Sequence, residues 1–244
     1  MLWGYMSMLL ETYDTGMANE ELYYKVMYLP YKFTRTDDPP TEKNPDVDIA
    51  NCYWTHQLYN FCPVSDPSYF QNPGLSASED PIYLDILGYL EAICPQMPKR
   101  ENLYSAYVNV LKDGDTPGIH VDSPYFVEDN QTVLLYLNPE WHPNWGGETI
   151  FYDHNLDAKY IVSPKPGRVV IFDGRIPHSG RPPTPRYKSN RYIMAFKYMD
   201  PKIRQKLFDD HEMNNLPPVR DHGILGFNPD TVEQIMTDAA RNRP

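Results

Sequence analysis

Two apolar runs decide the expected fold: Thr132-Val133-Leu134-Leu135-Tyr136-Leu137-Asn138 and Pro166-Gly167-Arg168-Val169-Val170-Ile171-Phe172-Asp173. Both are rich in residues that favour strands, and Pro, Gly or Asn residues stand at their ends, as is typical of strands separated by turns. Further short runs of this kind recur over residues 104–199. The pattern predicts a mainly β protein with flanking helices, whose core is a double-stranded β-helix, or jelly roll.

A single domain over residues 1–244 is expected from the length of the chain. Its predicted parts are a helical, aromatic-rich support region (1–100), the jelly-roll core (104–199) and a helical tail (200–244). In the first part, Asp80 suits an N-cap and Pro81 the first position of a helix that runs to Ile93. The stripe expected to pack this helix on the sheet consists of Ile82, Ile86, Leu90 and Ile93. In the tail, Asp230-Thr231-Val232-Glu233 has the pattern of a helix start.

Charge and cysteine content argue against several classes of protein. A formal net charge of -11 disfavours nucleic acid as a partner, because affinity for phosphates rests on clustered Lys and Arg. The first lysine is Lys25, so we expect neither a signal peptide nor a membrane span, and interpret Met1 to Leu10 as a buried helix or strand. The 3 cysteines are odd in number, which argues against a disulfide framework and favours the cytoplasm.

Three side chains with metal-binding chemistry lie among the predicted strands. His120 and Asp122 are one residue apart, and residues i and i+2 of a strand share a face, so both could contact one ion. His178 follows the second apolar run and would complete a triangular set of ligands from another strand. Two histidines and one carboxylate with open positions opposite are typical of non-haem Fe(II) oxygenases. The predicted catalytic and metal-binding residues are therefore His120, Asp122 and His178.

The motifs around these residues follow a recognisable order. Tyr136 lies in the first run; next come Trp145-Gly146-Gly147-Glu148-Thr149, the second run, His178, and finally Asn190-Arg191-Tyr192-Ile193. This order, over roughly Tyr104 to Met199, closely resembles the 2-oxoglutarate and Fe(II)-dependent dioxygenase superfamily of the prolyl 4-hydroxylase type. The resemblance implies Fe(II), with 2-oxoglutarate and dioxygen as co-substrates and ascorbate as a stimulant. It implies hydroxylation with release of succinate and carbon dioxide, and the retained Asp122 favours this over halogenation.

The resemblance also assigns a pocket for the co-substrate. A buried carboxylate needs a fixed cation, and Arg191 stands where the family places it, because guanidinium pairs bidentately with carboxylate and keeps its charge. Tyr136 matches the tyrosine whose hydroxyl shares that carboxylate. Lys188 is the competitor for this role, although its neighbours are typical of a turn. Lys197 lies six residues beyond Arg191 and would contact the keto acid or the substrate, or else point to solvent.

Further residues are candidates with a structural alternative. Tyr107 and Asn109 alternate on a strand before His120 and could donate to the metal-bound carboxylate of the co-substrate. Arg175, Tyr125 and Trp145 are assigned to the substrate side. A structural ion pair is the alternative for Arg175, and ordinary packing is the alternative for Trp145. The Gly146-Gly147 pair is expected to form a tight turn.

The substrate expected from the resemblance is a prolyl residue in a peptide or protein, and a free amino acid or small natural product is the alternative. Three other activities remain open: a nucleic-acid demethylase, since Lys197 follows Arg191 at the spacing of a second basic residue in those enzymes; a metal-binding, cupin-like jelly roll without enzymatic activity; and a hydrolytic zinc site, because the same ligands suit zinc.

Overall fold

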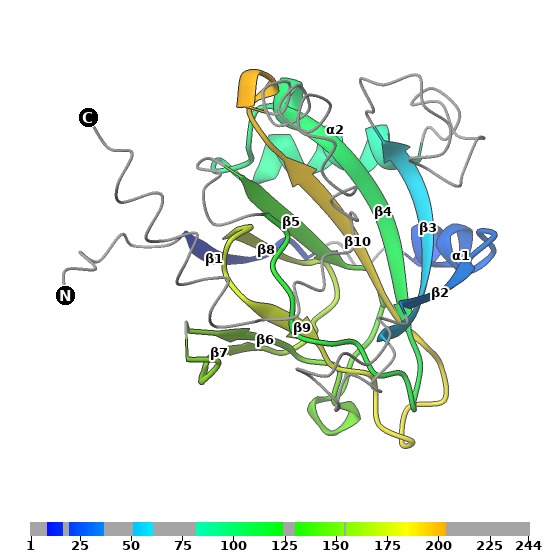
Figure 1. Cartoon of the computed structure of the whole chain (residues 1–244). Coiled ribbons are helices and arrows are strands. Elements are labelled where there is room, and N and C mark those ends of the chain that lie inside the picture. The colour runs from blue at the N-terminus through cyan, green and yellow to red at the C-terminus, as the bar shows by residue number, and fades with distance from the viewer. Residues whose placement is uncertain are drawn as a thin grey trace.

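Two antiparallel sheets form the centre of the computed structural model (Figure 1), which describes residues 9–16, 20–36, 51–60, 82–123, 130–153 and 155–203. In spatial order, the larger sheet consists of β1 (Leu10–Asp14), β8 (Arg168–Asp173), β5 (Gln131–Tyr136), β10 (Arg191–Tyr198), β4 (Leu103–Leu111), β3 (Asn51–Asn60) and β2 (Lys32–Thr36). The smaller sheet consists of β7 (Ala158–Val162), β6 (Thr149–Tyr152) and β9 (His178–Gly180). The predicted mainly β, jelly-roll fold is confirmed.

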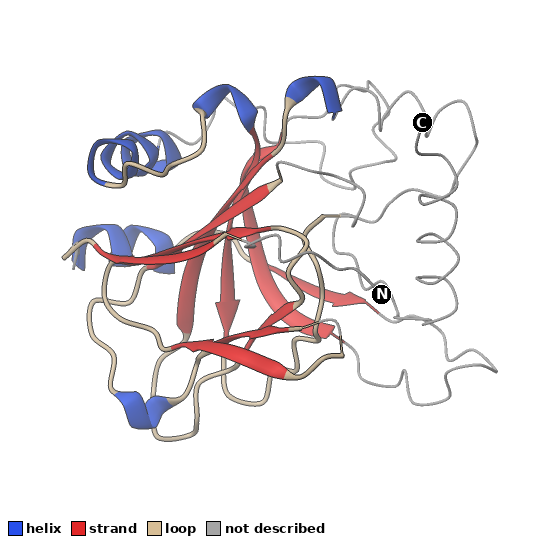
Figure 2. Cartoon of the chain, turned by 90° about the vertical axis from the view of Figure 1, so that its left-hand side faces the viewer, coloured by secondary structure: helices blue, strands red, loops and turns tan. Residues whose placement is uncertain are grey.

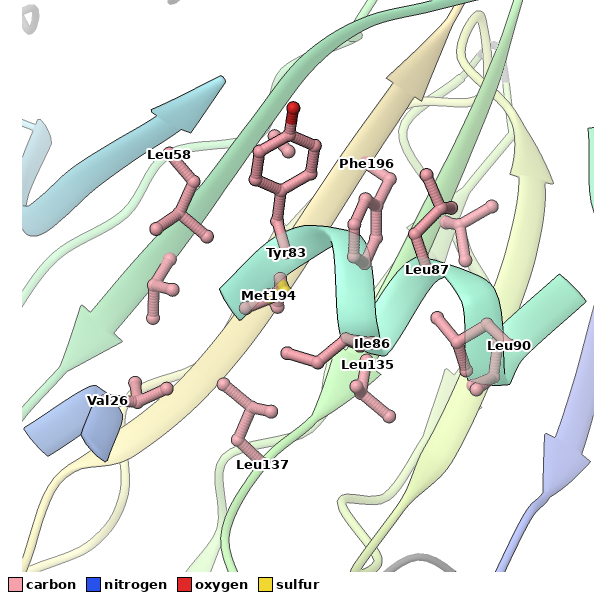
Figure 3. Packing of buried hydrophobic residues seen from close by; sticks show 14 of the residues in the cluster. Val26, Leu58, Tyr83, Ile86, Leu87, Leu90, Leu135, Leu137, Met194 and Phe196 are labelled. Carbon is pink, nitrogen blue, oxygen red and sulfur yellow. The ribbon is translucent and has the colours of Figure 1, made fainter. Parts of the chain in front are cut away.

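Helices cover the face of the larger sheet that points away from the smaller one (Figure 2). They are α1 (Glu20–Met27) and α2 (Ile82–Ile93), and two short 3-10 turns, η1 (Arg100–Asn102) and η2 (Pro143–Trp145), lie in connections. Figure 3 shows α2 side chains packed beside Leu135, Met194 and Phe196 of the sheet. No helix in the described ranges is long and apolar enough to span a membrane.

The helix expected over residues 81–93 is confirmed, but its buried face is centred differently. Ile86, Leu87 and Leu90 are buried, whereas Ile93 is 39% exposed, so its assignment to the packed stripe was wrong. At 100° per residue Ile93 lies at the margin of the arc formed by Ile86, Leu87 and Leu90. The N-cap assignment of Asp80 lies outside the described residues.

Strand β10 divides the interior into two cores. Its residues alternate, so that Tyr192, Met194, Phe196 and Tyr198 face the helices, whereas Ile193 and Ala195 belong to a cluster between the two sheets. All eight residues of β10 are buried, as expected for a central strand covered on both faces. Arg191 and Lys197 are an even number of residues from Ile193 and therefore lie on the same face of β10. Both cationic side chains thus enter the space between the sheets.

The N-terminal region contributes strands as well as the helices α1 and α2. Strands β1, β2 and β3 come from this region and extend the larger sheet at both of its edges. Leu10 begins β1, but residues 1–8 lie outside the described part, so the buried helix or strand expected over Met1 to Leu10 stays a prediction. The predicted helix at Asp230-Thr231-Val232-Glu233 also lies outside it, as does all of the tail beyond residue 203.

Candidate active site between the two sheets

The three predicted metal ligands converge at one end of the space between the sheets. One possible ligand atom from each of His120, Asp122 and His178 lies within 4.8 Å of the others. The Nε2 atoms of His120 and His178 are each 3.7 Å from an oxygen of Asp122. The sequence therefore selected three residues that the fold brings together across 58 positions (178 - 120).

The local backbone differs from the strand that was expected. His120 forms only an isolated bridge with His178, in which each backbone N–H donates to the other residue's carbonyl at 3.0 and 2.9 Å. Asp122 lies in a bend, held because its N–H donates to Gly174 O at 2.8 Å. The expectation of a strand at Asp122 was wrong, and the two side chains converge because a bridge and a loop contact replace the strand ladder.

Both imidazole rings are oriented by backbone carbonyls. His120 Nδ1 donates to Gly118 O at 3.2 Å, and His178 Nδ1 donates to Ile176 O at 2.9 Å. Each hydrogen bond sets the tautomer that leaves Nε2 with a free lone pair toward Asp122, as in metal-ligating histidines. Burial, with the neighbouring His120, lowers the pKa of His178 to about 4, which keeps the ring in the neutral form that binds metals.

Asp122 is fixed by two residues that are paired in register on adjacent strands. Lys197 of β10 lies opposite Thr132 of β5. Thr132 Oγ1 donates to Asp122 Oδ2 at 2.6 Å, and Lys197 Nζ lies 3.2 Å from Asp122 Oδ1. Burial by itself raises the pKa of Asp122, but the charge of Lys197, the two imidazoles and the Thr132 hydrogen bond outweigh it and hold that pKa below its usual range.

These residues fit a divalent metal ion such as Fe(II). Two neutral imidazole nitrogens and one ionised carboxylate are the donor set of a facial triad. With metal–ligand bonds of about 2.1 Å, neighbouring ligand atoms of an octahedron are roughly 3 Å apart. The 3.7 Å separations require side-chain shifts of under an ångström to reach this geometry. The His120 side chain is 35% exposed and that of His178 is 6% exposed, so the site is open to solvent on the His120 side.

A buried guanidinium occupies the other end of the space between the sheets. Arg191 is 3% exposed; its Nε donates to Gly147 O at 2.6 Å and its Nη2 donates to Thr149 Oγ1 at 2.9 Å. Thr149 Oγ1 also lies 2.6 Å from Tyr136 OH, and the Arg191 guanidinium lies 5.3 Å from the centre of the Tyr136 ring. Among the described residues no carboxylate forms an ion pair with Arg191, and burial lowers its pKa.

Strand β9 connects the two ends. His178 faces the metal site, and Gly180 lies against Arg191: an added Cβ at Gly180 would be 3.3 Å from Arg191 Nη1. Two residues of a strand span about 7 Å and their side chains share one face, so β9 contacts the metal site and the guanidinium from neighbouring positions on that face. Phe151 and Phe172, which pack on His178, belong to the apolar cluster between the sheets.

The Gly146-Gly147 pair positions Arg191. Both glycines have positive φ, 71° and 80°, but Gly146 pairs with Pro183 in an isolated β-bridge directly after η2, so the expected tight turn is replaced by a bridged segment. Trp141, Trp145 and Tyr187 form an aromatic cluster beside this segment, in which the rings of Trp145 and Tyr187 stack at 4.5 Å. Trp145 thus lies at the Arg191 end and is not brought beside the metal ligands. Its predicted contact with substrate stays a prediction.

The remaining candidates on strands point into the same space. Tyr107 and Asn109 of β4 pair with Ala195 and Ile193 of β10 and share their face of the sheet. Lys197 Nζ lies 5.5 Å from the centre of the Tyr107 ring. Asn109 Oδ1 is buried and has no hydrogen-bond partner in the described part of the chain. Both residues are thus placed where a bound acid would lie, and their roles stay predictions.

Three other residues have different surroundings. Arg175 forms a two-pronged ion pair with Asp173, with contacts of 2.6 to 3.1 Å, which is the structural alternative considered for it. Lys188 is exposed and donates to Pro185 O at 3.1 Å, so it does not compete with Arg191. Tyr125 lies outside the described residues.

The sequence analysis did not predict Thr132 and Thr149 as site residues. Thr132 is the one polar residue at the start of an otherwise apolar run, four positions before Tyr136 and on the same strand face. Thr149 closes the Trp145-Gly146-Gly147-Glu148-Thr149 motif. A polar residue on the inward face of a buried strand could have indicated a site residue, since a buried hydroxyl requires a hydrogen-bond partner.

Comparisons with known proteins agree with this arrangement. Residues 104–198 match the model of the 2OG-Fe(II) oxygenase superfamily, a span that contains every candidate site residue named above. No curated protein sequence matches the chain. Among solved structures, an oxidoreductase of the 2OG-Fe(II) oxygenase family from Burkholderia pseudomallei is similar at 15% identity and a TM-score of 0.51, covering 78% of this chain and 84% of its own.

A second similar structure is a prolyl hydroxylase from Trichoplax adhaerens in complex with a peptide fragment of the hypoxia inducible factor oxygen degradation domain. It is 17% identical, with a TM-score of 0.50, and the alignment covers 81% of this chain and 86% of the other. At this identity the likeness shows the fold. The predicted resemblance is confirmed: residues 104–198 match the 2OG-Fe(II) oxygenase superfamily, and the fold is similar to that of a prolyl hydroxylase.

Proposed function

We propose that this oxygenase hydroxylates an aliphatic C–H bond of a prolyl residue in a peptide or protein, with Fe(II), 2-oxoglutarate and dioxygen. The observation that carries the proposal is Arg191, a guanidinium that is 3% exposed and forms no ion pair among the described residues, so that Glu148 is the only carboxylate there whose charge acts on it, from beyond contact distance. A buried charge without a counter-ion in contact is costly, so this site is suited to an anion that arrives from outside. His178 at the metal site and Gly180 beside the guanidinium are two positions apart on β9 and share one face of the strand, an arrangement that suits a dicarboxylate whose other end binds the metal.

The residues at the two ends of the space between the sheets have different roles: one set would bind the metal and the other the distal carboxylate. His120, Asp122 and His178 would hold Fe(II), which when bound supplies the activation of dioxygen and the oxidative decarboxylation of the keto acid. Arg191 would neutralise the distal carboxylate of 2-oxoglutarate, with Tyr136 and Thr149 completing its hydrogen bonds. The phenylalanine rings beside His178 exclude water from the buried side of the centre.

One observation favours approach from the His120 side, and a second favours a peptide as the substrate. The His120 ring is exposed to 35%, whereas the Asp122 and His178 side chains are nearly fully covered. The similar Trichoplax prolyl hydroxylase was solved with a peptide bound. A free amino acid or small natural product is the second candidate, because an open metal site admits it equally well and the fold by itself does not select a substrate.

The co-substrate half of the proposal is tested without knowing the substrate. Anaerobic addition of Fe(II) and then 2-oxoglutarate should produce a visible metal-to-ligand charge-transfer band. Arg191→Met should shift the 2-oxoglutarate titration of this band to concentrations about a hundredfold higher, because it removes a buried charge-assisted pair. Arg186→Met, which removes an exposed arginine, is the matched control and should titrate as the wild type does. Confirmed metal binding without the band would instead favour a zinc hydrolase or a cupin-like binding protein.

The substrate half is tested by a screen of succinate release. Proline-containing peptides, free amino acids and nucleic acids are compared, with His178→Ala as the blank, and each product is examined by mass spectrometry for one added oxygen atom. We expect a peptide to stimulate succinate release and to gain the oxygen on proline. Stimulation by small molecules alone would refute the peptide assignment and leave the oxygenase assignment intact, whereas stimulation by nucleic acid would support the demethylase alternative.

A further inference from the structure

A buried ammonium group contacts the carboxylate of the candidate metal site. Lys197 Nζ lies 3.2 Å from Asp122 Oδ1, and the two side chains are 5% and 4% exposed. Burying such a pair costs free energy, because both charges lose their hydration. The two residues are 75 positions apart in the sequence (197 - 122), so the fold brings them together. Asp122 would obtain a cationic partner from the metal alone, so the lysine adds a second positive charge to the centre.

The contacts of Asp122 divide between its two oxygens. Oδ1 lies against Lys197, and Oδ2 accepts the hydrogen bond from Thr132 at 2.6 Å. Each oxygen also lies 3.7 Å from one histidine Nε2. A carboxylate oxygen has two lone pairs, so each retains one direction for a metal ion while its outer partner holds the carboxylate plane in place.

We infer that Lys197 is a positioning residue whose charge lowers the affinity of the site for the metal ion alone and raises its affinity for an anion bound beside the metal. This inference rests on the proposed function and deepens it. A divalent cation bound to Asp122 lies within a few ångströms of the ammonium and is repelled by it, whereas an anionic ligand of that cation is attracted. The two effects have opposite signs, and a loss of packing would weaken both kinds of binding together.

The position of Lys197 on β10 extends the argument to the class of anion. Arg191 and Lys197 share one face of β10 and lie near its two ends. The space between the sheets therefore has one cation at each end. A keto acid with a second carboxylate would therefore meet a positive charge at both ends. A short dianion such as oxalate could chelate the metal near Lys197 without reaching Arg191, so the two cations can be tested separately.

The experiment uses the full chain freed of metal with a chelator. Mn(II) affinity is measured from the loss of the free-ion EPR signal, and oxalate and 2-oxoglutarate are then titrated into the Mn(II)-loaded protein. For Lys197→Met we expect the Kd of Mn(II) to fall about tenfold and that of oxalate to rise about tenfold. Lys197→Arg, which retains the charge, should remain near the wild type in both. Arg191→Met should weaken binding of 2-oxoglutarate and leave oxalate unchanged.

Two controls separate charge from structure. Lys188→Met removes an exposed lysine and should change neither affinity. Thr132→Val removes the other hydrogen bond to Asp122 without a change of charge, so it should not tighten Mn(II) binding. If Lys197→Met weakens both Mn(II) and oxalate, or leaves both unchanged, the inference is wrong. If the wild type binds Mn(II) but not 2-oxoglutarate, the proposed function fails, and the metal titrations still decide the effect of Lys197.

Discussion

Gly147→Ala tests whether the segment after Trp145 sets the position of Arg191. Gly147 has a φ of 80°, and its carbonyl oxygen accepts the hydrogen bond from Arg191 Nε at 2.6 Å. A Cβ at this position would lie 2.5 Å from Cζ2 of Trp141 and 3.2 Å from Cδ of Arg191. The substitution therefore combines an unfavourable backbone conformation with a clash against the side chain that we assign to the co-substrate.

The magnitude follows from these two terms. An alanine at positive φ costs about 1–2 kcal/mol, and forcing a methyl group into a packed site costs about 1–3 kcal/mol. The sum, about 2–5 kcal/mol, corresponds to a fall in Tm of roughly 4–20 °C for a protein of this size. Because Arg191 must also move, we expect the KM for 2-oxoglutarate to rise about tenfold or more.

Thermal unfolding and the KM for 2-oxoglutarate are measured beside a control that carries only the backbone term. Gly114 has a φ of 87°, and nothing lies within 4 Å of an added Cβ there, so Gly114→Ala should lose about 1–2 kcal/mol and leave the KM unchanged. The difference between the two variants isolates the clash with Trp141 and Arg191. Equal losses of Tm, together with an unchanged KM in Gly147→Ala, would refute the assigned role of the segment.

Three further predictions concern the site itself. Asp122→Ala should abolish both succinate release and tight Mn(II) binding, since it removes the one carboxylate of the triad; full activity would contradict the ligand assignment. Gly180→Ala should raise the KM for 2-oxoglutarate several-fold and leave Mn(II) affinity unchanged, because its Cβ would lie 3.3 Å from Arg191 Nη1; a loss of metal affinity would contradict this separation. The metal-free protein should lose up to about 3 kcal/mol of stability as pH falls from about 6.5 to about 4, since the unfolded state binds a proton at His178 before the folded state does. Urea unfolding across that range should show this slope, and His178→Gln should lack most of it.

Local patterns in the sequence predicted those features that depend on a repeat along one segment. The helix over residues 82–93 and the strands around Tyr136 and Phe172 follow from spacing and composition within a few residues. The centre of the buried face of α2 did not follow, because Ile93 and Leu87 are equally apolar and the sheet alone determines which of them it covers. The strand expected at Asp122 failed for a related reason: the bridge between His120 and His178 and the contact with Gly174 O shape this segment.

The sequence by itself determined the chemistry of the site: which residues could bind a metal, and which cation could bind a distal carboxylate. Tertiary structure alone decided how those residues are held. It placed Lys197 and Thr132 on the two oxygens of Asp122, Thr149 and Gly147 on Arg191, and Asp173 on Arg175. Most of these contacts join strands far apart along the chain, and strand order and register are set by the packing of two cores at once, which no single segment encodes.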